Sequence, residues 1–213
     1  MRTMAIKIWA IAVLCIICSC YSVNSFAQTG NSNIDEPGVT NNKDMPQAEL
    51  QKQTGPAGEL YVDERIGFEI TAPKGWVKRV DRRGNVIFSK EAASDQIVFP
   101  YPSLGVVIDA LPPDMNSALL FSTAAMSHYE AGALKNNIAF NLVEFPHEIE
   151  INGIKGARFI FEMSSPGKAM KSIDCKFMKD GVIISLQGMD HPGDFGSSLK
   201  DFEETIKSFK FNK

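Results

Sequence analysis

Apolar and polar side chains alternate along much of the chain after residue 57, which is the pattern of half-buried β-strands. The first alternation runs through Ile66, Phe68 and Ile70, and Pro73-Lys74-Gly75 then turns the chain into Trp76. The same pattern predicts further strands at residues 86–89, 103–110, 148–151, 154–163, 170–178 and 182–187.

Two-residue turn signals separate the later strands. Asn152-Gly153 favours a type I′ hairpin, because both central residues of that turn need a positive φ. Pro166-Gly167 and Asp180-Gly181 follow at the next two strand ends. Turns this short join neighbouring antiparallel strands, so the second half of the chain is predicted to form a meander.

Helical periodicity occurs in two places. Asp114, after Pro112-Pro113, is predicted to cap a helix of about 17 residues that stops at Gly132 and carries one apolar stripe. A closing helix is predicted to begin near Asp194 or Ser197. The two apolar stripes comprise Met115, Leu119, Met126 and Tyr129 in the first helix and Leu199, Phe202, Ile206 and Phe209 in the second. The predicted fold is α+β, an antiparallel sheet of about six to seven strands covered by helices in an α/β/α sandwich.

The N-terminus is typical of an export signal. Arg2 and Lys7 precede an apolar run from Ile8 to Cys18, which as a helix would span about 16 Å, roughly half of a bilayer core. A run this short indicates a signal peptide and not a membrane span. We expect an exported protein, in the periplasm or anchored in the outer membrane as a lipoprotein.

Two processing sites are compatible with this segment. Small residues at Ser25 and Ala27 favour cleavage before Gln28, so that residues 1–27 are the signal peptide. Alternatively, residues 17–20 approximate a lipobox in which Cys20 would be lipidated. After cleavage at Ala27 the chain keeps only Cys175, which excludes an intramolecular disulfide.

The amino-acid composition separates a linker from a globular domain in the rest of the chain. In residues 28–57, 18 of 30 residues are Gly, Pro, Asn, Gln, Ser or Thr and none is aromatic, which predicts a disordered linker. Residues 58–213 are predicted to form one globular domain. The net charge of −3 and a pI of about 5.7 disfavour nucleic acid as a partner.

Residues 67–76, with the sequence GFEITAPKGW, resemble the opening hairpin of PsbP-like domains, where a Gly-Phe strand leads into a Pro-x-Gly-Trp turn. The Asn152-Gly153 hairpin with its aromatic strand, and the closing helix that leads into Ser208-Phe209-Lys210-Phe211, resemble the second half of the same family. The resemblance covers about residues 60 to 211. It implies an antiparallel sheet between helices and a non-catalytic protein that binds other macromolecules. The family includes the extrinsic photosystem II subunit, small Ran-binding proteins and many bacterial envelope proteins.

The best candidate for metal binding or acid–base chemistry is the loop from Asp190 to Asp194, where His191 stands between two carboxylates. Helix capping by Asp194 and turn formation by Asp190 explain the same residues, so we expect no metal site and no catalytic residue. His147 with Glu144 and Glu148, and His128 with Glu130, are weaker candidates, because a lone histidine near carboxylates is usually a surface residue. Cys175 alternates with Ile173 and Phe177, which predicts a thiol in the core.

Two segments could contact a partner. Lys78-Arg79 and Arg82-Arg83 surround Asp81 in a predicted solvated turn, with contact to an acidic protein or anionic headgroups as the alternative. Phe99-Pro100-Tyr101-Pro102 is predicted to lead into a strand, with an aromatic docking ledge as the alternative. The turn at residues 164–168 is predicted to be a hairpin and not a phosphate loop.

These observations favour an exported, non-catalytic binding or accessory protein of the bacterial cell envelope, without a cofactor. Its expected partner is an envelope protein or complex, and its only expected membrane contact is a lipid anchor at Cys20. Two alternatives stay open, a carrier of small apolar ligands and, third, an envelope metal-dependent hydrolase.

Overall fold

The computed structural model describes residues 58–80, 84–90 and 102–212. The predicted signal peptide and linker, with the lipidation candidate Cys20, lie outside these residues. Arg82, Arg83 and the first three residues of the Phe99–Pro102 segment lie outside them as well.

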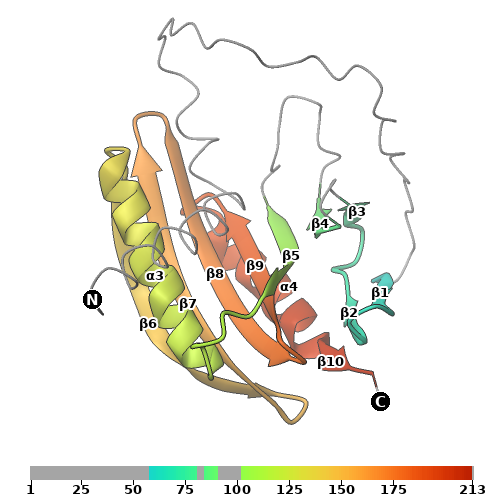
Figure 1. The fold of residues 1–213 in the computed structure, drawn as a ribbon. Coiled ribbons are helices and arrows are strands. Elements are labelled where there is room, and N and C mark those ends of the chain that lie inside the picture. Colours follow the sequence, from blue (N-terminus) through green and yellow to red (C-terminus); the bar gives the residue numbers. More distant parts are fainter. Residues whose placement is uncertain (1–57, 81–83, 91–101, 213) are drawn as a thin grey trace, which may run out of the picture.

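A seven-stranded antiparallel sheet forms the centre of the fold, in the order β3-β4-β5-β9-β8-β7-β6 (Figure 1). Strands β6 to β9 are consecutive in the chain and adjacent in space, so the predicted meander is confirmed. The strand bounds are Val77–Val80 (β3), Val86–Ser89 (β4), Ser103–Ala110 (β5), Ala139–Ile151 (β6), Ile154–Ser165 (β7), Lys168–Lys179 (β8) and Val182–Asp190 (β9).

The tight turns of the meander have the predicted backbone conformation. Asn152 and Gly153 have φ angles of 52° and 78°, and Asp180 and Gly181 have 48° and 79°. Positive φ at both central residues is the requirement of the type I′ turn. These dipeptides therefore determine where β6 turns into β7 and where β8 turns into β9.

A second, three-stranded sheet joins the two ends of the domain. It has the order β1-β2-β10, formed by Leu60–Asp63 (β1), Phe68–Thr71 (β2) and Lys210–Phe211 (β10). The backbone N–H of Thr71 also donates to the Ser208 hydroxyl, 137 positions later in the chain. Neither β1 nor β10 was predicted from the alternation.

Two helices cover opposite faces of the large sheet (Figure 1). Helix α3 (Ala118–Lys135) packs on β6, β7 and β8, and helix α4 (Phe195–Ser208) packs on β8, β9 and β2. The α+β sandwich predicted from the sequence is thus confirmed. Among the residues that the structure describes, neither helix is long and apolar enough to cross a membrane.

The predicted bounds of α3 were wrong. Ser117, not Asp114, is the N-cap, and its hydroxyl accepts from the backbone N–H of Leu120 at 3.1 Å. The helix continues through Gly132 to Lys135, because a single glycine costs only about 1 kcal/mol inside a helix. Asn137, with a φ of 56°, then turns the chain out of the helix.

The buried side of α3 consists mainly of small residues. Phe121 is its only large buried side chain, whereas Met126 and Tyr129 are partly buried and Met115 precedes the helix. The predicted stripe was therefore only partly right. Small side chains let the helix lie close to the sheet, where it meets the aromatic residues of β7.

The stripe predicted for α4 was correct in its central residues. Phe202 and Ile206 are buried against the sheet, and Phe209 follows at the C-cap. The Phe202 ring packs edge-on against Trp76 with 5.9 Å between ring centroids, and Phe177 stacks on Phe209 at 4.6 Å. Through these aromatic contacts the Trp76 turn packs against the closing helix.

Candidate functional site

The Asp190 loop is organised around α4 and not around a ligand. Asp190 is almost fully buried, and its carboxylate accepts from the backbone N–H of His191 at 2.7 Å and from the Ser198 hydroxyl at 2.5 Å. Asp194 occupies the N-cap position of α4 but makes no side-chain capping bond. Asp194 is therefore the N-cap residue by position, as predicted, but the carboxylate that binds the first turn of the helix is that of Asp190, at the end of β9.

His191 lies at the surface of this loop, and its Nδ1 is 3.3 Å from the carbonyl oxygen of Ala169. Within residues 58–80, 84–90 and 102–212, no three His, Cys, Asp or Glu side chains come together as a metal site requires. The expectation that Asp190, His191 and Asp194 hold no metal stays a prediction.

Cys175 lies in the core on the α4 side of β8, as its alternation predicted. Burial raises the pKa of its thiol, and the neighbouring Asp174 carboxylate raises this pKa further. Since the thiolate is the nucleophilic form, this cysteine is poorly suited to covalent chemistry.

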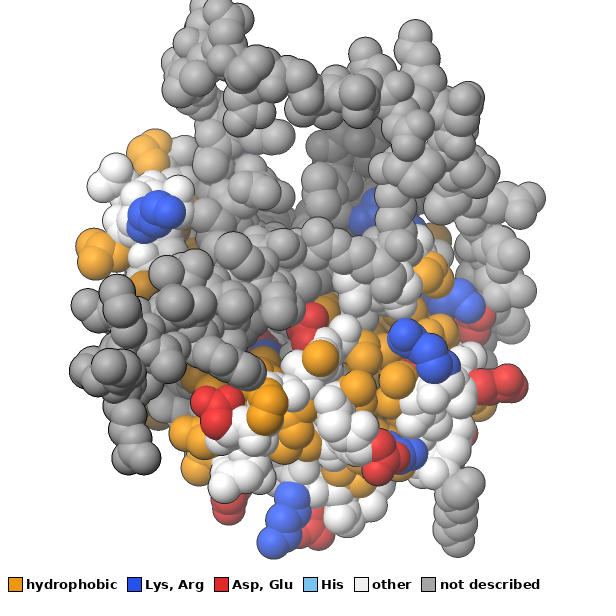
Figure 2. All heavy atoms as spheres, in the orientation of Figure 1, with side chains coloured by type: hydrophobic (Ala, Val, Ile, Leu, Met, Phe, Trp, Pro, Cys, Tyr) orange, Lys and Arg blue, Asp and Glu red, His pale blue; other side chains and the backbone are white. Residues whose placement is uncertain are grey.

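The basic cluster is divided by the fold. Lys78 and Arg79 lie on β3, so their predicted placement in a turn was wrong, whereas Asp81, Arg82 and Arg83 lie outside the described residues. The Nζ of Lys78 forms an ion pair with Glu59 at 3.0 Å and lies 5.8 Å from the centre of the Tyr61 ring. Lys78 thus helps to hold β1 beside β3. On the face shown in Figure 2, basic and acidic side chains lie interspersed among apolar ones.

A buried ion pair lies under α3. The Nζ of Lys176 is 3.0 Å from the Asp174 carboxylate and 3.0 Å from the Ser185 hydroxyl, and both charged side chains are nearly fully buried. The Tyr129 hydroxyl donates to Asp174 at 3.3 Å, and the Lys176 ammonium lies 5.5 Å from the centre of the Phe121 ring. Burial raises the pKa of Tyr129 well above its usual value, and Asp174 contributes to the rise.

This pair joins α3 to β8 and β9. An ion pair removed from water stabilises little in net terms, but separating its partners is costly. We therefore interpret it as a device that sets the position of α3 on the sheet. The alternation along β8 does not reveal this pair, because both faces of the strand are buried and the polar face resembles an exposed one.

The edge strand β6 carries two irregularities. Leu142 pairs with Phe161, Glu144 pairs with Ile160, and the pairing shifts by one residue between them. It shifts again before His147, which pairs with Arg158. Each shift is a β-bulge that inserts one extra residue into β6.

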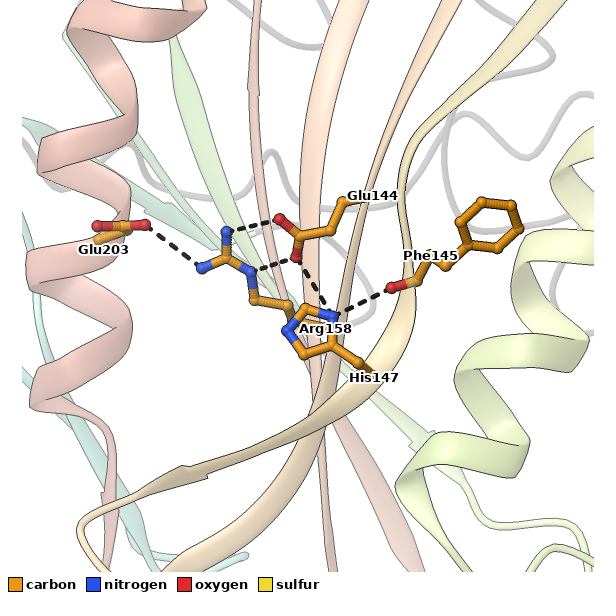
Figure 3. A network of polar contacts seen from close by, with 5 residues as sticks. All are labelled: Glu144, Phe145, His147, Arg158 and Glu203. Carbon is orange, nitrogen blue, oxygen red and sulfur yellow. Dashed lines mark hydrogen bonds and ion pairs between the residues drawn. The ribbon is translucent and has the colours of Figure 1, made fainter.

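The two bulges reverse the direction of the residues between them. Glu144 shares a side of the sheet with Ile160, which belongs to the core under α4. Phe145 therefore projects on the other side, toward α3. Figure 3 shows these two side chains leaving β6 in opposite directions.

Glu144 forms the centre of a polar network that spans three elements (Figure 3). Its two carboxylate oxygens accept from the Nε and Nη2 of Arg158 at 2.6 and 3.1 Å, and the Nη1 of Arg158 donates to Glu203 of α4 at 3.3 Å. The Nδ1 of His147 lies 3.1 Å from the carbonyl oxygen of Phe145 and 3.5 Å from Glu144. The hydrogen bonds that Arg158 donates to Glu144 raise the pKa of Arg158.

The bidentate Glu144–Arg158 pair holds the bulge in one geometry, because a planar guanidinium fits a carboxylate in few orientations. The Phe145 side chain, fixed at this point, is 74% exposed, and Val143 beside it is 45% exposed. Phe145 is the only aromatic residue among the exposed large apolar side chains of the described part of the chain. We call residues Val143 to His147 the bulged edge.

The strand before the Asn152 turn was predicted at residues 148–151, whereas β6 begins at Ala139. No role was predicted for Glu144 and His147. The alternation does not show the bulges, because the second bulge restores the phase that the first one reverses. The apolar positions of β6 change from even numbers (140 and 142) to odd numbers (149 and 151) because its first part packs against the core under α3 and its last part against the core under α4.

Comparison with solved structures identifies the architecture. The cyanobacterial PsbP protein CyanoP from Synechocystis sp. PCC 6803 aligns over 82% of this chain and 98% of its own length, with a TM-score of 0.56 and 14% sequence identity. The chain has a PsbP-like fold. The resemblance based on residues 67–76 and the closing helix is confirmed for the fold. Residues 67–76 do not form the expected hairpin, because β2 pairs with β1 and β10 whereas β3 pairs with β4 in the large sheet.

Two further structures are similar at lower scores. A Bacteroides thetaiotaomicron protein aligns over 74% of this chain and 49% of its own, with a TM-score of 0.48 and 13% identity. LpqN of Mycobacterium tuberculosis, involved in cell envelope biogenesis, aligns over 73% of this chain and 90% of its own, with a TM-score of 0.47 and 12% identity. The fold assignment depends on CyanoP alone. No protein-family profile and no curated protein matches the sequence.

Proposed function

We propose that this chain is an exported, non-catalytic binding or accessory protein of the bacterial cell envelope, and that it contacts its partner through the bulged edge of β6. The export signal predicted for residues 1–27 and the family resemblance support the cellular setting. The exposed ring of Phe145 supports the mode of action.

The observation that carries the proposal is an exposed aromatic ring on a fixed backbone. Phe145 is 74% exposed, yet the strand beneath it is held by Arg158 and Glu203 through three hydrogen bonds. A rigid aromatic side chain loses little conformational entropy on binding, and such residues dominate the affinity of many interfaces. The bulged edge has the properties of such an anchor.

The contact is expected to use side chains and not an added strand. Pro146 has no N–H to donate, and two bulges interrupt the regular hydrogen-bonding spacing of the free edge. A partner strand could not pair continuously along β6. Insertion of the Phe145 ring into a pocket of the partner requires no strand pairing, so Pro146 and the bulges do not hinder it.

The packing of the core favours a function in binding a partner over a function as a carrier of small apolar ligands. The aromatic rings between the sheet and α4 lie against one another, with Phe68–Phe209 at 5.6 Å, Phe195–Phe202 at 5.9 Å and Tyr61–Phe68 at 6.0 Å between centroids. Rings at these distances are in contact. A carrier of apolar ligands would need a cavity among these rings, and rings in contact with one another leave little space for one.

Site-specific photocrosslinking tests the proposal. The photoreactive residue p-benzoylphenylalanine replaces Phe145 in one version of the full chain and Leu134 in another, produced in the cell that makes the protein. Leu134 is 79% exposed on α3 and serves as a matched control. We expect a discrete cross-linked protein from position 145 and none of that size from position 134.

Complementation provides the second readout. Phe145→Ala should fold normally, because an exposed side chain contributes within about 0.5 kcal/mol to stability, and it should fail to restore the phenotype of a gene deletion. Leu134→Ala should restore it. Full complementation by Phe145→Ala, together with no cross-link from position 145, would overturn the proposal.

A further inference from the structure

We infer that the bulged edge docks on a basic protein surface, namely an apolar pocket for Phe145 bordered by Lys or Arg side chains. This inference rests on the proposed function and specifies the partner's chemistry. The charges along β6 and their position relative to α3 carry it.

Strand β6 is acidic. Its 13 residues include Glu144, Glu148 and Glu150 and no Lys or Arg. Glu144 is neutralised internally by Arg158, whereas Glu148 and Glu150 are exposed and form no ion pair with another described residue. Two exposed carboxylates without an ion pair therefore accompany the exposed ring.

These carboxylates lie on the same side of the sheet as Phe145. Glu148 pairs with Ala157, two residues before Phe159 on β7, and Phe159 belongs to the core under α3. Glu150 follows two residues later and therefore projects on the same side. Lys155 is the cross-strand neighbour of Glu150 and the only basic residue that the pairing places beside these two.

Helix α3 does not cover this part of β6. The strand starts four residues after α3 ends and runs back along it (Figure 1). The 18 residues of α3 span about 27 Å, a length that an extended strand covers in about eight residues. Glu148 and Glu150 thus lie near or beyond the N-terminal end of α3, on an open stretch that continues from Phe145.

An apolar ring next to two free carboxylates selects its partner by charge. Lys or Arg side chains around the receiving pocket would be attracted, and an acidic protein or an anionic bilayer surface would be repelled. Interactions of this kind contribute modestly to affinity, more to the rate of association, and weaken as salt screens them. Dependence on salt and on both glutamates is the expected signature.

The test uses the full chain with p-benzoylphenylalanine at position 145. In this background Glu148→Gln and Glu150→Gln are combined, and the yield of cross-linked protein is compared with the parent at about 0.05 M and about 0.5 M NaCl. A matched control combines Glu64→Gln with Glu130→Gln, which removes two exposed carboxylates elsewhere. Urea unfolding confirms that all versions fold alike.

We expect the double glutamine variant and the higher salt each to lower the yield about threefold or more, while the control variant matches the parent. An unchanged or increased yield from the Glu148/Glu150 variant would overturn the basic-partner inference and leave the proposed contact standing. A cross-link to lipid instead of protein would also overturn it. No cross-link from position 145 in the parent would overturn the proposed function and this inference with it.

Discussion

Phe202 is expected to be the most costly side chain of α4 to remove. Its ring is fully buried and packs against Trp76 and Phe195, each at 5.9 Å between centroids. A buried aromatic residue covers about 150–250 Å², which at about 25 cal/mol per Å² corresponds to roughly 4–6 kcal/mol. Measured Phe→Ala costs of about 3–5 kcal/mol agree with this range, so we expect Phe202→Ala to lower the free energy of unfolding by about 3–5 kcal/mol.

The ring lies directly over a glycine of β9. A Cβ placed on Gly188 would be 2.6 Å from Cγ of Phe202, closer than two carbon atoms can approach. Gly188→Ala should therefore force the ring or the strand to move, at a cost of about 1–3 kcal/mol.

The two substitutions should compensate each other. When Phe202 is alanine, the new methyl at position 188 meets a cavity and no longer a ring. We expect Gly188→Ala to cost close to nothing in that background, which gives a favourable coupling of about 1–3 kcal/mol in a double-mutant cycle.

Urea unfolding of the four proteins, followed by tryptophan fluorescence, measures the cycle. Gly105→Ala is the matched control, because Gly105 is also buried in a central strand and a Cβ there would lie 4.0 Å from its nearest neighbour, the Gln187 carbonyl oxygen. The control should be close to neutral. Additive costs at positions 188 and 202, or equal costs for the two glycine substitutions, would refute the packing of α4 on β9.

Three further results are expected. Burial raises the pKa of Cys175 in the folded state, so stability is complete below the ordinary thiol pKa and falls above about pH 8.5 by roughly 1.4 kcal/mol per pH unit. Urea midpoints between about pH 8.5 and pH 10 should show this fall, and Cys175→Ala should remove it; above that range the raised pKa of Tyr129 adds a similar fall. Arg158→Ala should cost about 1–3 kcal/mol in the same assay and reduce cross-linking from position 145, whereas equal cross-linking would contradict the role of Arg158 in holding the bulge. Mass spectrometry of the protein from its own cells should find an N-terminus at Gln28 or a lipidated Cys20, and an intact Met1 would contradict both.

Features that depend on neighbouring residues could be predicted from the sequence. The Asn152-Gly153 turn requires only two residues that tolerate positive φ, and the apolar stripe of α4 follows from the helical repeat alone. Residues 67–76 and the closing helix together indicated the PsbP-like fold, because each combines a turn with a core pattern in a fixed order. Local conformation and periodicity are properties of adjacent positions, so the sequence displays them directly.

The bulged edge could not be predicted in the same way. Its geometry depends on Arg158, 14 positions after Glu144, and on Glu203, 45 positions after Arg158. Alternation shows which residues are apolar, but it does not show that two inserted residues turn Glu144 toward α4 and leave the Phe145 ring in solvent.

The buried ion pair under α3 could not be predicted from the alternation either. Asp174 and Lys176 alternate with the buried Cys175, which is also the pattern of a strand with one face in water. Only the packing of α3 on that face makes them a buried ion pair, held by Tyr129. Sequence alone thus determined the turns, the closing helix and the order of the meander, because these depend on short-range geometry. The tertiary structure decided which polar side chains are buried and which aromatic one is exposed, because burial depends on partners that only the folded chain brings together.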